Sequence, residues 1–356
     1  MDNNNNKIKI NMLSMADSVD GQGVGSAYLE LMKLLNEDGK NDFEIFLNKG
    51  TKYDVIHAHT VEPRNYLKLK FSKNPTVAYV HFLPDTLDGS IKLPKPIFKI
   101  FKKYVISFYK SADYLVVVNP IFKKDIAKAG IKEDKITYIP NFVSKEMFYK
   151  KTDKEIKDIR KKLGIKENKF VVLGAGQIQN RKGVIDFVEV AKKLPKIYFI
   201  WAGGFSFGGI TDGHHDLKKI MENPPKNVRF LGIVPRNEMN DLFNASDLLF
   251  VPSYNELFPM TILEAISTDT PILLRDLELY EDILFKKYLK GSNNDEFSEI
   301  IKLLSKDKKE YQKQVENAKE ISKFYSKEHV YKMWKEFYTE IAKKKKKEKK
   351  KKKKSE

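Results

Sequence analysis

Two glutamates eight residues apart carry the clearest chemical signal in the chain. Glu256 and Glu264 enclose Leu-Phe-Pro-Met-Thr-Ile-Leu, just after a short apolar run at 248–251 that predicts a buried strand. If a helix begins near Phe258, Glu264 lies about two turns inside it, and the first-turn N–H groups face an anion. The carboxylates can then accept hydrogen bonds from hydroxyls on both sides of a bound phosphate, which favours a nucleotide sugar. An isolated pair also fits a helix-terminal acid stabilised by the helix dipole plus a surface glutamate.

Glycine-rich loops support the first interpretation. The run Gly-Ala-Gly-Gln-Ile-Gln-Asn-Arg-Lys-Gly at 174–183 follows a predicted strand and opens a helix. Its glycines allow close backbone approach to a phosphate, and Arg181 and Lys182 can offset diphosphate charge. A second loop, which contains Gly21 and Gly23, follows the first predicted strand in the same way.

We expect neither metal nor thiol chemistry. The chain has no cysteine, which excludes disulfides, thiolate metal sites and cysteine nucleophiles and suits a reducing cytoplasm. His57 and His59 alternate on one predicted strand, but no third ligand at a suitable spacing accompanies them. His81 ends another predicted strand at the sheet edge where open α/β folds bind ligands, so it is either a site residue or a structural histidine.

The elements that must position these residues alternate along the chain. Short β-rich runs, separated by segments long enough for crossover helices, predict mostly parallel sheets covered on both faces. The pattern restarts after a polar, helix-prone stretch at 152–163, and apolar residues at helical spacing predict a terminal helix at 325–342. We therefore expect an α/β protein with two Rossmann-like, doubly wound domains facing a central cleft. The predicted strands are 7–13, 43–47, 53–57, 76–82, 114–118, 136–139, 170–174, 197–201, 228–231, 248–251 and 271–274.

Length and charge agree with this organisation. A chain of 356 residues has room for two domains, and no apolar run is long enough to span a membrane. The N-terminus lacks the layout of a signal peptide, so we expect no export by that route. The net charge of +18 is concentrated in 64–110, with ten basic and two acidic residues, and in 343–356, with eleven lysines and two glutamates. Such localised positive charge predicts contact with anionic lipid or nucleic acid, although a lysine tail can also be a disordered, solubilising end.

The segment 92–110 combines this charge with apolar residues at helical spacing. Its sequence predicts a basic amphipathic helix of the kind that lies on a membrane surface. The alternative is a helix that packs its aromatic side inward and leaves a basic side in solvent. The side chains expected to contact the membrane are Lys99, Phe101, Lys102, Lys103 and Phe108.

These motifs together resemble the retaining GT-B glycosyltransferases of family 4. The resemblance covers nearly the whole chain except the first six residues and the lysine tail. It implies that Glu256 contacts hydroxyls of the donor sugar, that Glu264 contacts the ribose, and that Lys182 contacts the diphosphate. One departure is Gln177, which stands where the family usually has an arginine, and Arg181 is the neighbour able to replace it. The remaining donor-binding residues that it implies are Gly21, Gly23, Phe258, Pro259, Met260 and Thr261.

The same resemblance implies how the reaction proceeds. Retention is attributed to a front-face substitution in which the departing diphosphate helps to deprotonate the acceptor, so no dedicated protein base is expected. His81 would lie near the reacting sugar, where it orients the substrate or stabilises charge. The expected donor is a UDP-hexose, either glucose or galactose, and neither a cofactor nor a metal is expected.

Further segments, at 20–26, 79–94, 176–183 and 203–213, are similar to the diglycosyl-diacylglycerol synthases of Gram-positive bacteria and their wall-less relatives. This implies transfer to a monoglycosyl-diacylglycerol by an enzyme peripheral to the inner face of the cell membrane. Diacylglycerol itself or a cell-wall or capsule glycan is the alternative acceptor, and nucleic-acid binding is a remote alternative function. The expected domains are 1–150, facing acceptor and membrane; 151–324, binding the nucleotide sugar; the helix 325–342, packing back toward the first domain; and the disordered tail 343–356.

Overall fold

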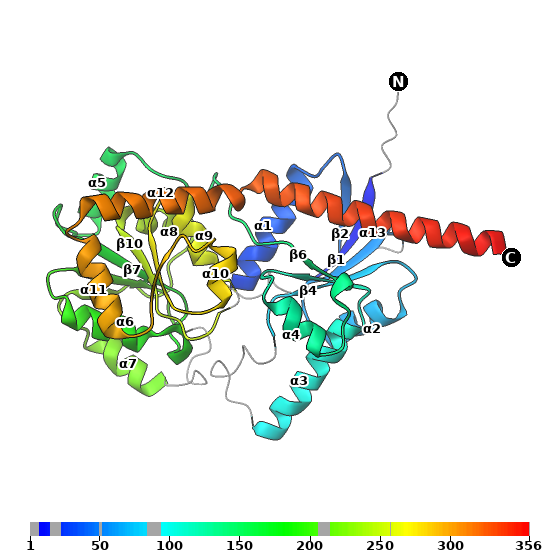
Figure 1. The fold of residues 1–356 in the computed structure, drawn as a ribbon, viewed down its shortest axis with the longest axis horizontal. Coiled ribbons are helices and arrows are strands. Elements are labelled where there is room, and N and C mark those ends of the chain that lie inside the picture. The colour runs from blue at the N-terminus through cyan, green and yellow to red at the C-terminus, as the bar shows by residue number, and fades with distance from the viewer. Residues whose placement is uncertain are drawn as a thin grey trace. The chain divides into compact units, whose positions relative to one another are not determined.

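The computed structural model describes residues 7–14, 23–49, 52–83, 94–205, 214–256 and 258–355 (Figure 1). Gly21 lies outside these residues. The chain divides into two compact units, one formed by Met1–Asp85, Pro94–Phe142 and Ser326–Glu356, and the other by Thr86–Leu93 and Val143–Tyr325.

The first unit is built around a six-stranded parallel sheet in the order β2-β1-β3-β4-β5-β6. Its strands are short, and the central ones are largely buried, as expected for a parallel sheet that is covered by helices. The edge strands β2 and β6 have one buried residue each. The chain reverses its direction of winding between β1 and β3. The elements are β1 (Ile8–Leu13), α1 (Gly23–Glu37), β2 (Phe43–Leu47), β3 (Val55–Ala58), α2 (Pro63–Phe71), β4 (Thr76–Val80), α3 (Lys95–Lys110), β5 (Tyr114–Val117), α4 (Phe122–Lys128), the 3₁₀ helix η3 (Glu133–Lys135) and β6 (Ile136–Tyr138).

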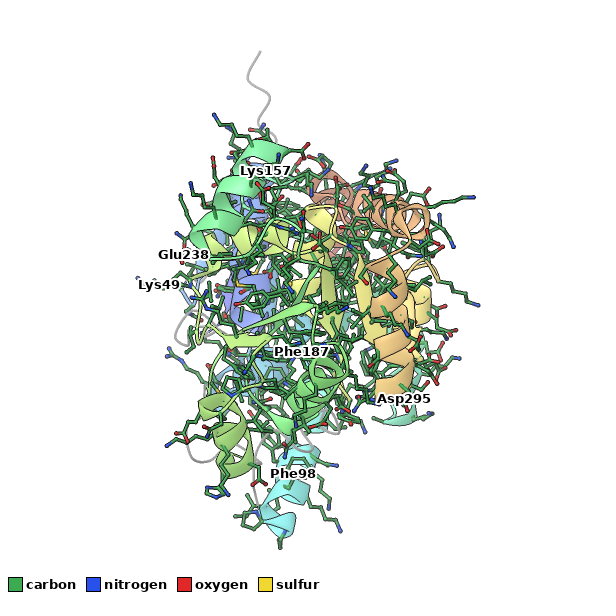
Figure 2. All side chains as sticks on the ribbon, turned by 90° about the vertical axis from the view of Figure 1, so that its left-hand side faces the viewer. Lys49, Phe98, Lys157, Phe187, Glu238 and Asp295 are labelled. Atoms are coloured by element: carbon green, nitrogen blue, oxygen red, sulfur yellow. The ribbon has the colours of Figure 1, made fainter. Side chains whose placement is uncertain are left out.

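The second unit repeats the architecture with the order β12-β11-β10-β7-β8-β9, again all parallel. Its core includes Phe187, labelled in Figure 2, whose ring meets those of Phe199 and Trp201 edge to face. The elements are α5 (Asp153–Lys162), β7 (Val171–Ala175), the 3₁₀ helix η4 (Asn180–Lys182), α6 (Val184–Lys193), β8 (Tyr198–Ala202), α7 (His214–Glu222), β9 (Val228–Phe230), α8 (Arg236–Ala245), β10 (Leu248–Val251), α9 (Met260–Ser267), β11 (Ile272–Arg275), α10 (Leu279–Ile283), β12 (Leu289–Gly291), α11 (Asn294–Leu304) and α12 (Lys308–Phe324).

The division between the units falls at Phe142, a little before residue 150, where the sequence suggested it. The segment that follows is held by the second unit, because Asn240 and Asn244 of α8 accept hydrogen bonds from the backbone N–H groups of Tyr149 and Lys151, at 3.1 and 2.8 Å.

The last helix, α13 (Lys327–Ser355), belongs to the first unit and contacts β1 and α1 (Figure 1). Trp334 and Tyr338 are buried there, and the Tyr338 hydroxyl lies 2.7 Å from Nδ1 of His57. The helix continues through the lysine-rich residues, where the sequence suggested disorder. Lysine is a good helix former, and extending an existing helix avoids the cost of a new nucleus. No helix within the described ranges is both long and apolar enough to cross a membrane.

Candidate active site

Two loops of the second unit bring the predicted donor-binding residues to one place. Strands β7 and β10 are neighbours, and the winding of the chain reverses between them. At such a switch point the loops that leave the carboxyl ends of the strands diverge, and open α/β sheets bind ligands there. The loop after β7 carries Arg181 and Lys182, and the loop after β10 carries Glu256. The sheet order therefore places both motifs at the position that favours a nucleotide ligand.

Glycines bring the backbones of this site close together. Gly203 has φ +146°, and a Cβ there would overlap the carbonyl oxygen of Gly176. Gly183 has φ +70°, and a Cβ there would overlap the carbonyl oxygen of Pro252, in the loop that leads to Glu256. Larger residues would force these segments apart, so Gly183 sets the spacing of the loops after β7 and β10, and Gly203 sets that of the loops after β7 and β8.

Glu256 is the centre of a buried charged cluster. Its carboxylate accepts a hydrogen bond from the Lys182 ammonium and lies 3.9 Å from the Arg181 guanidinium, while Ser253 also hydrogen-bonds it. Burial raises the pKa of Glu256, but the charges of Lys182 and Arg181 outweigh burial and hold it below its usual value. Glu256 is therefore an ionised acceptor at neutral pH, with two cations beside it that suit a diphosphate.

Glu264 lies on α9 and is also buried. The helix begins at Met260 with Pro259 as its N-cap, later than predicted, so Glu264 stands little more than one turn inside it. Its Oε1 lies 3.5 Å from Nε of Arg236, at the start of α8.

The other predicted donor-site residues differ in their burial and in the contacts of their side chains. Phe258 is buried, with its ring centroid 5.2 Å from that of Tyr325, and Met260 is buried as well. Thr261 is partly exposed in the first turn of α9. Gln177 is partly exposed and accepts a hydrogen bond of 2.8 Å from the side chain of Gln179. Arg181, which the sequence suggested as a replacement for the missing arginine, lies beside Glu256.

His81 follows β4 in the first unit and ends a stack of aromatic rings. Its ring lies 4.2 Å from that of Tyr79 at an interplanar angle of 22°, and its Nε2 lies 3.2 Å from Nδ1 of His59. Burial lowers the pKa of His81 to about 3, so the imidazole is neutral near pH 7 and acts by hydrogen bonding. Gly23 is the first residue of α1, the helix that follows β1 in the chain, and β1 belongs to the same sheet as β4.

Helix α3 has two different halves. Its first turns expose Ile97 and Ile100 at 52% and 69%, beside the exposed Lys99 and Lys103, and Figure 2 labels Phe98 there. Lys102 packs its ammonium 4.7 Å from the centroid of the Phe98 ring.

The second half of α3 is core. Phe108 is only 1% exposed and contacts the rings of Tyr66 and Tyr109, so the prediction that it touches a membrane is wrong. Phe101 is partly buried and stacks on Phe82 with the ring centroids 6.5 Å apart. The second half of the helix thus packs its aromatic side inward, while the first turns leave apolar and basic side chains exposed.

Sequence reasoning missed two arginines. Arg236 pairs with Glu264, and Arg275 is buried at the end of β11. An arginine that directly follows a predicted buried strand is the signal that could have identified Arg275. Among the described residues, no group of three or more histidines or acids could hold a metal ion.

Comparison with known proteins agrees with this geometry. The family described as "Glycosyl transferases group 1" matches residues 155–321, and "Glycosyltransferase Family 4" matches residues 40–146. The chain is 48% identical to an alpha-galactosylglucosyldiacylglycerol synthase of Streptococcus pneumoniae, over 93% of this chain and 89% of the relative. It is 29% identical to a processive diacylglycerol alpha-glucosyltransferase of Acholeplasma laidlawii, over 90% and 94%.

Solved structures share the fold. Anabaena Alr3699/HepE in complex with UDP and glucose has a TM-score of 0.73 at 17% identity, covering 93% of this chain and 99% of that one. A sucrose-phosphate synthase of Thermosynechococcus elongatus has a TM-score of 0.76 at 14% identity, over 94% and 99%. With two Rossmann-like units, the paired glutamates and these relatives, the chain belongs to the GT-B glycosyltransferases of family 4.

Proposed function

We propose that this chain transfers a hexose from a UDP-sugar to a monoglycosyl-diacylglycerol, with retention of the anomeric configuration. The observation that carries the proposal is the identity of 48%, over nearly the whole chain, to a relative named as an alpha-galactosylglucosyldiacylglycerol synthase. That name supports galactose as the first donor to test. Glucose is the second, because the relative at 29% identity is named as a glucosyltransferase.

On the donor side, the diphosphate lies against Lys182 and Arg181, and a sugar hydroxyl donates to Glu256. As the bond between the anomeric carbon and the diphosphate breaks, negative charge grows on the leaving oxygen. Fixed cations stabilise that charge more than they stabilise the ground state, which accelerates the reaction. The acceptor hydroxyl forms its bond on the same face and passes its proton to the leaving diphosphate. Because Lys182 and Arg181 supply the positive charge, we expect sugar transfer to continue in the presence of a metal chelator.

We also propose a role for His81, which follows β4 in the first unit. Its neutral imidazole donates or accepts one hydrogen bond to the reacting sugar or the acceptor, while His59 occupies its Nε2 side at 3.2 Å.

The acceptor stays in a bilayer, so the enzyme works at the inner surface of the membrane. The first turns of α3 suit that surface, because exposed Ile97 and Ile100 can enter the headgroup region while Lys99 and Lys103 contact anionic lipids.

A matrix of donors and acceptors tests the proposal. Purified protein is incubated with labelled UDP-galactose or UDP-glucose and with vesicles that contain diacylglycerol or monoglucosyl-diacylglycerol, with and without EDTA. We expect label in a dihexosyl lipid, with a preference for the glycosylated acceptor. Faster transfer to diacylglycerol favours the second candidate, the first glycosylation, which the Acholeplasma laidlawii relative supports by its name. No transfer to either lipid contradicts both.

A further inference from the structure

Arg275 joins four segments around the loop that carries Glu256. It is the last residue of β11 and is 8% exposed. Its Nε donates to the carbonyl oxygen of Pro252 at 2.8 Å, and one terminal nitrogen donates to the carbonyl of Ser292 at 3.3 Å. The other terminal nitrogen lies 3.2 Å from a carboxylate oxygen of Asp186 on α6. One planar side chain thus ties β11 to α6 and to the segments after β10 and β12.

The face of the same guanidinium covers Tyr254. Its central carbon lies 3.8 Å from the centroid of the Tyr254 ring, a cation–π contact. The Tyr254 hydroxyl donates to Asp186 at 2.8 Å, so Asp186 joins the guanidinium and the phenol. Tyr254 is 54% exposed, yet it is fixed at both its ring and its hydroxyl.

These contacts continue to the charged cluster. The N–H of Tyr254 donates to the carbonyl of Arg181 at 2.8 Å, and the Arg181 guanidinium donates to the carbonyl of Asn255 at 3.2 Å. The next residue is Glu256, bonded to Lys182. From Pro252 to Glu256, the loop is held by Arg275 at its start and by Arg181 and Lys182 at its end.

We propose that Arg275, oriented by Asp186, is a positioning residue that holds Pro252 and Tyr254 so that Glu256 meets the donor. This inference rests on the proposed function, because it assumes that Glu256 binds the donor sugar. Arg275 itself does not touch the substrate. The three guanidinium nitrogens point to three different partners, while the flat face of the group stacks on the Tyr254 ring. A lysine ammonium cannot reproduce that geometry.

Arg160 offers a matched control near the amino ends of the strands of the same sheet. Its side chain is 15% exposed, compared with 10% for that of Arg275. It also donates to two carbonyls, of Ala245 at 2.9 Å and Lys169 at 3.3 Å, and pairs with one carboxylate, Asp247, at 2.8 Å. Lys169 and Asp247 precede β7 and β10, so Arg160 lies at the amino ends of these strands, away from the carboxyl ends that lead to Lys182 and Glu256.

The experiment compares Arg275→Lys with Arg160→Lys in the full chain. Urea unfolding curves at several temperatures identify one at which both variants are folded. The kcat and the KM for the UDP-hexose are then measured at that temperature. We expect similar losses of stability, but a kcat about tenfold lower in Arg275→Lys than in Arg160→Lys. Equal kcat values, within about twofold, overturn the inference.

Two further variants keep the test decisive. Tyr254→Phe removes only the hydroxyl bond to Asp186 from an exposed side chain, so it serves if Arg275→Lys does not fold. We expect a kcat reduced by about threefold or more with unchanged urea stability, and an unchanged kcat overturns the inference. Glu256→Gln is measured in parallel. If it stays active, the proposed function of this site fails; if it is inactive while Arg275→Lys matches its control, only the positioning role fails.

Discussion

Lys182 and Glu256, 74 residues apart in the chain, form a buried ion pair at the switch point of the second sheet. The lysine lies in a glycine-rich loop after β7, and the glutamate lies in a loop after β10. Glu256 is buried and Lys182 is partly buried, and each provides the countercharge that the other needs. In the proposed function, the pair therefore joins the lysine that would bind the diphosphate to the carboxylate that would bind the sugar.

Replacing Glu256 with Gln tests this pair directly. We expect kcat to fall by about 100-fold or more, because an amide cannot accept hydrogen bonds from the sugar as a charged carboxylate does. The chain should still fold, although Lys182 loses its countercharge and the free energy of unfolding should fall by about 1–3 kcal/mol. Steady-state transfer and urea unfolding measure the two effects. Activity within about twofold of the wild type would remove Glu256 from the site.

Gly203 should tolerate no side chain. Its φ of +146° and the carbonyl oxygen of Gly176 beside it leave no room for a Cβ, so Gly203→Ala should lower the free energy of unfolding by about 3 kcal/mol or more. Gly232 is the control, with φ +71° and no atom within 4 Å of an added Cβ, and Gly232→Ala should cost about 1 kcal/mol. Urea midpoints measure both. Equal losses in the two variants would contradict the close approach at Gly203.

Buried histidines should make the first unit sensitive to acid. Burial lowers the pKa of His57 to about 3, from 6.5. Between these values the unfolded chain binds a proton that the folded chain does not, so stability falls as pH decreases. The slope is up to about 1.4 kcal/mol per pH unit for each such histidine. His57→Asn should therefore show a smaller loss of urea stability from pH 7 to pH 5 than the wild type. An identical slope in both proteins would contradict a neutral, buried His57.

Membrane attachment should depend on the first turns of α3. Ile97→Glu and Ile100→Glu should weaken sedimentation with anionic vesicles by about tenfold, with stability unchanged because both side chains are exposed. Leu303→Glu on α11 is the matched control, since Leu303 is 50% exposed and Ile97 is 52% exposed. Raising the salt concentration should weaken binding of the wild type. Equal binding by all three variants would exclude this surface.

Local patterns in the sequence were sufficient to predict most of the fold. Eleven predicted strands correspond to β1 through β11, because buried parallel strands are continuous apolar runs. The twelfth strand, Leu289–Gly291, was missed because it has three residues and its central lysine is exposed. The start of α9 was misplaced by two residues because a proline can stand either in the first helical turn or just before it.

The candidate site was harder to predict in full. Glu256, Lys182 and Arg181 could be chosen because their motifs adjoin predicted strands. The pairing of Glu264 with Arg236 and the contacts of Arg275 depend on which strands are neighbours, and local pattern does not determine that order. The burial of Phe108 was missed for a similar reason, since helical spacing alone does not tell which half of an amphipathic helix packs against the core.

Transfer of the sugar itself is the most direct test of the account. Wild-type protein and the Glu256→Gln variant are given UDP-galactose labelled in the hexose, with monoglucosyl-diacylglycerol in anionic vesicles, and the lipid product is analysed by mass and by NMR at the anomeric carbon. We expect a dihexosyl-diacylglycerol with a new α-linkage, formed by the wild type and almost absent with the variant. A β-linked product, or an equal yield from both proteins, would contradict it.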